Sequence, residues 1–153
     1  MRVYIPATFE DIQSPVLQVS TGVAVTSAFC EQFLEENDLE FLEDCAFTQA
    51  SFLSFMKLQS NNVSIKARFV ISADISDEDC LEDSNFPGKV SIEKPISWDN
   101  IACIHAEDIE EIFNIIKLLS KGEEEVESEI DTIPLLWFDK SERPILIDMF
   151  KGL

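Results

Sequence analysis

Glycine is scarce in this chain, with four residues among 153, and no glycine-rich loop that could cradle a phosphate is present. The sequence also has no HExxH zinc motif and no nucleophile elbow, the turn that presents a catalytic serine. We therefore expect no nucleotide cofactor, and no other cofactor is predicted.

Metal-binding patterns are also missing. The four cysteines, at positions 30, 45, 80 and 103, form no CxxC pair. Cys45 on an apolar helix stripe and Cys103 within a strand are expected to be buried thiols rather than ligands or nucleophiles. A calcium loop starting at Asp74 would need Gly where Asp79 stands and Glu where Asn85 stands. The acidic segment 74–83 is therefore interpreted as a solvated turn, and no metal site is predicted.

Basic residues are few, because 11 Lys and Arg face 30 Asp and Glu, and the net charge is −19. Such a charge repels phosphate backbones, so direct binding to nucleic acid is not expected. An acidic surface that imitates nucleic acid would need carboxylates arrayed along one face of the protein. In this sequence the acids cluster at helix starts, in one loop and in one spacer, so such mimicry is not favoured. A protein partner, if there is one, is expected to be basic.

Long apolar runs are absent as well. No segment approaches the roughly 20 apolar residues that span a bilayer. Glu10 and Asp11 follow the N-terminus before a signal-peptide core could form. We expect a cytoplasmic protein that does not bind membranes.

Apolar residues are abundant at 46%, and those between 38 and 59 predict one long helix around which the chain packs. They recur at helical spacing on two stripes, Leu39, Leu42, Ala46, Ala50 and Leu53, and Phe41, Cys45, Phe52, Phe55 and Met56. A helix with apolar residues on more than one side should be covered on more than one side. Its length would be about 30 Å at 1.5 Å per residue, the width of a small domain.

The remaining pattern predicts the fold class. Strands are expected at 2–5, 22–25, 63–73, 89–93 and 101–105, and helices after Thr8, after Thr26 or Ser27, and from Ala106. Helices and strands interleave, but the later strands come in succession. We therefore predict a single α+β domain over residues 1–153, with a mixed sheet of four or five strands and the long helix packed on one face.

The C-terminal part has a different composition. Residues 123–131 are rich in glutamate and predict a solvated spacer. The apolar segment that follows, 133–138, should return to the body of the protein or dock on a partner. Trp137 and Phe138 are the candidate partner-binding residues, and the sequence leaves open whether they belong to the core or to an interface.

His105 is the only histidine, and it stands at the end of a predicted strand. It could act as a general base oriented by Asp74 or Asp108, with Arg2 holding an anion. No nucleophile accompanies it. A structural or helix-capping role for His105 is the alternative.

Several segments carry a resemblance to a known family: residues 1–8 (MRVYIPAT), 24–26, 38–41, 72–74, 104–108 and 135–138. In these segments, which lie along nearly the whole chain, the protein resembles a family of small actinobacterial proteins of unknown function. The resemblance implies a single cytoplasmic domain, and it transfers no mechanism.

Two classes of function remain. The sequence favours an acidic, non-enzymatic module that binds an unknown protein partner or regulates it, because catalysis usually needs several converging polar groups with shifted pKa values. The alternative is a small enzyme that uses His105 as general base with a neighbouring carboxylate.

Overall fold

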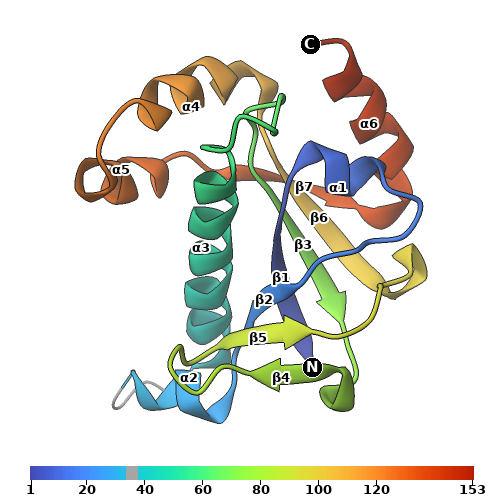
Figure 1. Ribbon diagram of the computed structural model, residues 1–153, viewed down its shortest axis with the longest axis vertical. Helices are drawn as coiled ribbons and strands as arrows, with labels where there is room; N and C mark the ends of the chain where they lie inside the picture. The colour runs from blue at the N-terminus through green and yellow to red at the C-terminus, as the bar shows by residue number, and fades with distance from the viewer. Residues whose placement is uncertain (34–37) are drawn as a thin grey trace.

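Seven strands form one antiparallel sheet in the order β4-β5-β2-β1-β3-β6-β7 (Figure 1). The protein is described from a computed structural model, in which residues 1–33 and 38–153 are placed. The strands are β1 (Arg2–Ala7), β2 (Thr21–Ala24), β3 (Phe69–Asp74), β4 (Cys80–Glu82), β5 (Lys89–Ile92), β6 (Ile101–Glu107) and β7 (Leu135–Asp139). The predicted α+β class is confirmed. The prediction of a mixed sheet with four or five strands is wrong, because every strand pair is antiparallel and there are two further strands. The sequence did not indicate these two strands, because β4 has only three residues and β7 shows no alternation of polar and apolar residues.

The helices are α1 (Phe9–Gln13), α2 (Ser27–Glu31), α3 (Leu39–Lys57), α4 (Ile112–Leu119), α5 (Glu123–Ile130) and α6 (Arg143–Lys151). Single 3-10 turns occur at η1 (Asp77–Asp79), η2 (Trp98–Asn100), η3 (Ile109–Glu111) and η4 (Lys140–Glu142). Local chemistry starts α1 and α2 where the sequence predicts, whereas the helix expected from Ala106 begins only at Ile112, because β6 continues to Glu107 and η3 follows it. The Thr8 amide donates to the Asp11 carboxylate at α1, and the Thr26 hydroxyl accepts from the Phe29 amide at α2. No helix within the described ranges is both long and apolar enough to cross a membrane.

The central helix α3 has 19 residues and packs across β1, β2 and β3 on one face of the sheet (Figure 1). Its buried apolar residues are Leu42, Ala46, Ala50 and Phe55. The expectation that both stripes are covered is wrong in part, because Leu39, Phe41 and Leu53 are exposed. α4 and α5 pack against the C-terminal half of α3, in the cluster around Phe55, so they do not cover Leu39 and Phe41 near its start, and Leu53 lies outside that cluster.

The opposite face of the sheet is covered by α1 and α6 (Figure 1). Three aromatic rings join these layers, with centroid distances of 5.6 Å between Phe9 and Phe150 and 5.0 Å between Phe69 and Phe150. All three side chains are buried. This face therefore holds the main core, and α6 is part of it.

The predicted spacer at 123–131 is helical instead, because it forms α5. Val126 and Ile130 are four residues apart, share one face of that helix and are buried against α3 and α4. The apolar segment behind it is β7, which pairs with β6 over five residues. The C-terminal segment thus folds back onto the sheet.

Candidate functional site

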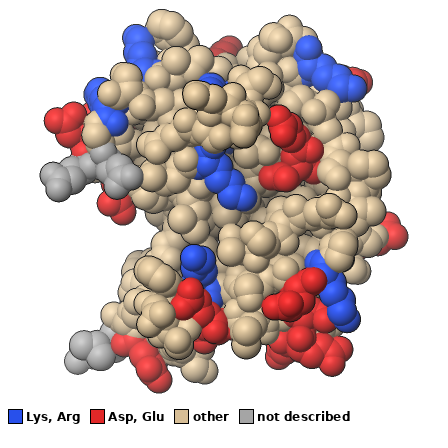
Figure 2. Space-filling view, in the orientation of Figure 1, with Lys and Arg blue, Asp and Glu red and all other residues tan. Residues whose placement is uncertain are grey.

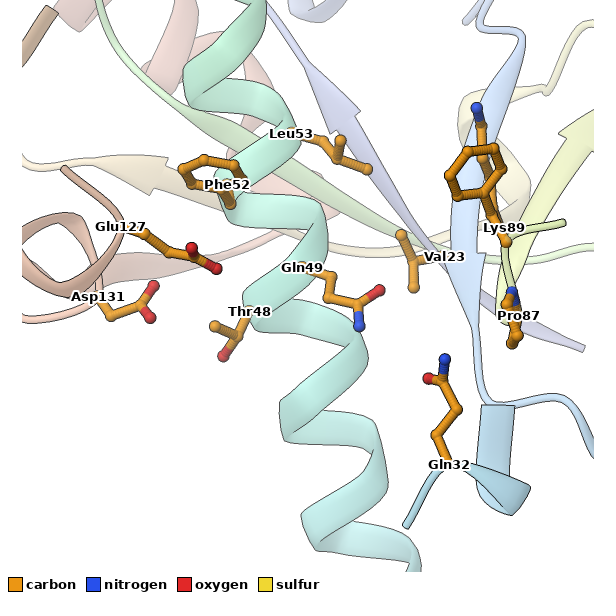
Figure 3. A pocket seen from close by; sticks show the side chains of 11 residues that line it. Val23, Gln32, Thr48, Gln49, Phe52, Leu53, Pro87, Lys89, Glu127 and Asp131 are labelled. Atoms are coloured by element: carbon orange, nitrogen blue, oxygen red, sulfur yellow. The ribbon is translucent and has the colours of Figure 1, made fainter. Parts of the chain in front are cut away.

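A groove of about 400 Å³ runs over the outer face of α3 (Figure 3). Its floor is formed by Thr48, Gln49, Phe52 and Leu53 of α3, one wall by Val23, Gln32, Phe86, Pro87 and Lys89, and the other wall by Glu127 and Asp131. Figure 2 shows the surface hollowed on this side of the molecule. We call this feature the α3 groove.

The wall next to β5 is held by hydrogen bonds between segments far apart in sequence. The Glu82 carboxylate accepts from the Thr26 hydroxyl and from the Gly88 amide. Gly88 has φ +89°, and a Cβ there would lie 2.4 Å from Phe29 Cδ2, so only glycine fits. These contacts fix the loop that places Phe86 and Pro87 beside α3.

The opposite wall carries two carboxylates without neutralising partners. Glu127 and Asp131 are four residues apart, and Figure 3 shows both on the same side of α3. Burial and the charge of Glu127 raise the pKa of Asp131 above its ordinary value, and the positive charge of Arg68 opposes this shift. Neither carboxylate forms an ion pair or hydrogen bond with any residue that the structure describes. This wall is therefore chemically suited to a cation.

A buried ion pair fixes the end of α5. Arg68 and Glu107 are each 1% exposed, and Arg68 donates from Nε and Nη2 to the two Glu107 oxygens, at 2.7 Å each. The same guanidinium donates to Ser51 Oγ at 2.9 Å, to the Ile133 carbonyl at 2.8 Å and to the Ile130 carbonyl at 3.4 Å. Arg68 thus ties α3, β6 and the segment after α5 together and positions the acidic wall of the groove. We call this cluster the Arg68 clamp.

The structure joins two of the four predicted catalytic residues. Arg2 Nε donates to an Asp74 oxygen at 2.8 Å, and both side chains are exposed at the end of β1 and β3. The Asp108 carboxylate accepts from the Glu110 amide at the start of η3. His105 pairs with Val70, four residues along β3 from Asp74, which corresponds to about 13 Å of strand. This geometry therefore gives His105 no orienting carboxylate for a role as general base.

His105 lies in an apolar environment. Its ring is 4.6 Å from the Phe47 ring, centroid to centroid, and its buried Nδ1 has no hydrogen-bond partner among the described residues. Burial lowers the pKa of His105 below its ordinary value of 6.5. The contacts resemble those of a half-buried packing residue.

The lowered pKa predicts a pH dependence of stability. The unfolded chain takes up a proton at His105 before the folded protein does, so the free energy of unfolding should fall as the pH drops below about 6.5. The variant His105→Leu should lose this part of the dependence. Urea titrations of both proteins between pH 7.5 and 5 test this, and parallel pH profiles would contradict it.

Metal chemistry finds no support in the described part of the chain, where no group of three His, Cys, Asp or Glu side chains converges. The four cysteines form no disulfide with one another, and each is half-buried, so the full burial expected for Cys45 and Cys103 is wrong in part. Cys103 lies two residues from His105 on β6.

The predicted partner-binding residues lie on β7, an outer strand of the sheet. Trp137 is 60% exposed and stands opposite His105, whose ring packs against Phe47 of α3. Leu136 is also exposed, whereas Phe138 packs against the main core. β7 therefore exposes two apolar side chains at the edge of the sheet, while Phe138 fixes the strand to the main core.

Sequence reasoning missed both the clamp and the groove. Arg68 interrupts the apolar run that becomes β3, and Glu107 ends the one that becomes β6. A charge within a strand of this kind needs a partner, which is a usable signal for a buried pair. The groove left no such signal, because its residues come from the ends of α2 and α5, from α3, from β2 and β5 and from the loop before β5.

These features define an antiparallel α+β protein in which a buried ion pair supports an open groove. The chain belongs to a family of unknown function, DUF6912, whose model matches residues 1–147. That span includes all seven strands, the Arg68 clamp and the α3 groove. The resemblance seen in the sequence is thus confirmed at the level of such a family, while its actinobacterial range stays a prediction. No curated protein and no solved structure matches the chain.

Proposed function

We propose that this protein is a non-enzymatic, cytoplasmic module that binds an extended segment of a basic partner protein along β7. The observation that carries the proposal is the exposed apolar edge of β7. An edge strand has one row of unpaired backbone groups, which an added strand can satisfy. Trp137 and Leu136 would contact the partner, and Phe138 would hold the strand in place.

The two edges of the sheet differ in a way that supports this choice. The other edge, β4, has three residues and is followed by Asp83, features that protect an edge against pairing. β7 has five residues, and four of them are apolar. β7 is thus the edge better suited to a partner strand.

The charge supports a basic partner. A net charge of −19 attracts positively charged proteins and repels other copies of this chain. Figure 2 shows acidic side chains in separate groups on the visible face. The association rate with a basic segment should therefore fall as salt is raised.

Selection from a random peptide library displayed on phage tests the proposal directly. Selected peptides should be basic, and binding should slow hydrogen exchange of the β7 amides. Trp137→Ala should weaken binding about 30-fold or more, because exposed tryptophans that become buried in interfaces are often worth at least 2 kcal/mol.

Phe113→Ala is the matched control, because Phe113 is 65% exposed on α4, away from β7. It should bind the selected peptides as the natural protein does. Equal losses in both variants, or protection of amides elsewhere than in β7, would contradict the proposal.

A further inference from the structure

We propose that the α3 groove is a binding site for a small organic cation with an apolar body, such as an arylalkyl ammonium ion. The site is independent of β7 and is formed by other residues. The charged end of the ligand would lie at Glu127 and Asp131, and its apolar body would lie over Phe52 and Leu53.

The size and floor of the groove suit a small molecule. Its volume of about 400 Å³ lies within the range of roughly 300–1,000 Å³ that is usual for ligand pockets. Phe52 and Leu53 on the floor, with Phe86 and Pro87 on the wall next to β5, offer apolar surface on two sides. Leu53 and Phe86 are exposed in the free protein and would be covered by a ligand.

The charges of the two walls give the ligand a direction. Both carboxylates lie on the α5 side, and Lys89 lies on the β5 side, as Figure 3 shows. Lys89 Nζ lies 5.1 Å from the centre of the Phe86 ring. A cationic end is attracted at one wall and repelled at the other, so a ligand would bind in one orientation.

The acidic wall is unfavourable for the free protein. Like charges four residues apart on a helix repel each other, and Asp131 stands at the C-terminal end of α5, where the helix dipole disfavours a negative charge. A cation bound between the carboxylates would relieve both effects. Removing a charge should therefore stabilise the empty protein and weaken ligand binding at the same time.

Three ligands that share a phenylethyl body and differ in the charge of their end group distinguish the effect of charge from that of apolar contact. NMR titrations of the intact protein with 2-phenylethylammonium, 2-phenylethanol and 3-phenylpropionate measure affinity and map the site. The cation should bind most tightly and the anion most weakly, with shifts at α3 and α5. An anion that binds as well as the cation, or shifts that avoid the groove, would overturn the proposal.

Charge variants supply the second readout. Asp131→Asn should raise the melting temperature of the free protein. It should weaken binding of 2-phenylethylammonium about tenfold and leave the affinity for 2-phenylethanol unchanged. The corresponding carboxylate-to-amide change on another surface, Glu110→Gln in η3, is the control and should leave the affinity for both ligands unchanged. Loss of affinity for the alcohol together with the cation would indicate a structural effect and overturn the charge assignment.

Discussion

Replacing Arg68 by alanine is expected to lower the free energy of unfolding by about 3–5 kcal/mol, because the change leaves Glu107 charged and unpaired in the interior. The same change removes the hydrogen bonds that Arg68 donates to Ser51 Oγ and to the carbonyls of Ile130, the last residue of α5, and Ile133. Such a loss is a large share of the 5–15 kcal/mol that stabilises a typical domain. Urea unfolding followed by circular dichroism measures it.

An apolar replacement of the whole pair distinguishes an unpaired charge from lost packing. The double variant Arg68→Met, Glu107→Leu should be much closer in stability to the natural protein than either single variant, because no buried charge remains without a partner. A double variant as unstable as Arg68→Ala would show that the stability depends on the hydrogen bonds to Ile130 and Ile133 more than on charge pairing.

Removing the residues after Glu129 is expected to abolish cooperative folding. The truncation deletes three fully buried side chains, Ile130, Leu146 and Phe150, together with β7. Losing a large buried side chain typically costs about 2–5 kcal/mol, so these three alone approach the whole stability of a domain. Thermal unfolding followed by near-ultraviolet circular dichroism would then show no sharp transition.

A shorter truncation provides the control. Ending the chain at Phe150 removes only exposed residues and should leave the transition close to that of the full chain. A folded protein that ends at Glu129 would mean that the C-terminal segment is dispensable to the core and would return it to a purely partner-binding role.

Local chemistry was readable from the sequence alone. Thr8 and Thr26 start helices where they were expected, because a hydroxyl or amide near a helix start bonds within three residues of itself. Strands such as β1 and β6 followed from alternation over several residues. The net charge of −19 is also a property of the sequence, and with it the expectation of a basic partner.

Short elements depended on tertiary contacts. An isolated helix of eight residues such as α5 is unstable in water, because so few hydrogen bonds do not offset the entropy of forming the first turn. α5 forms since Val126 and Ile130 find a surface on α3 and α4. In the sequence, the run of glutamates in α5 suggested a solvated spacer and gave no indication of a helix.

Tertiary contacts also determined which residues meet at the candidate site. Arg68 meets Glu107 39 positions later, and the α3 groove joins residues from Val23 to Asp131, so no local window contains either feature. His105 stood near carboxylates in sequence, yet its side chain lies against Phe47. Residue types and local hydrogen bonds are determined by the chain itself, whereas the meeting of distant side chains is determined by how helices and strands pack.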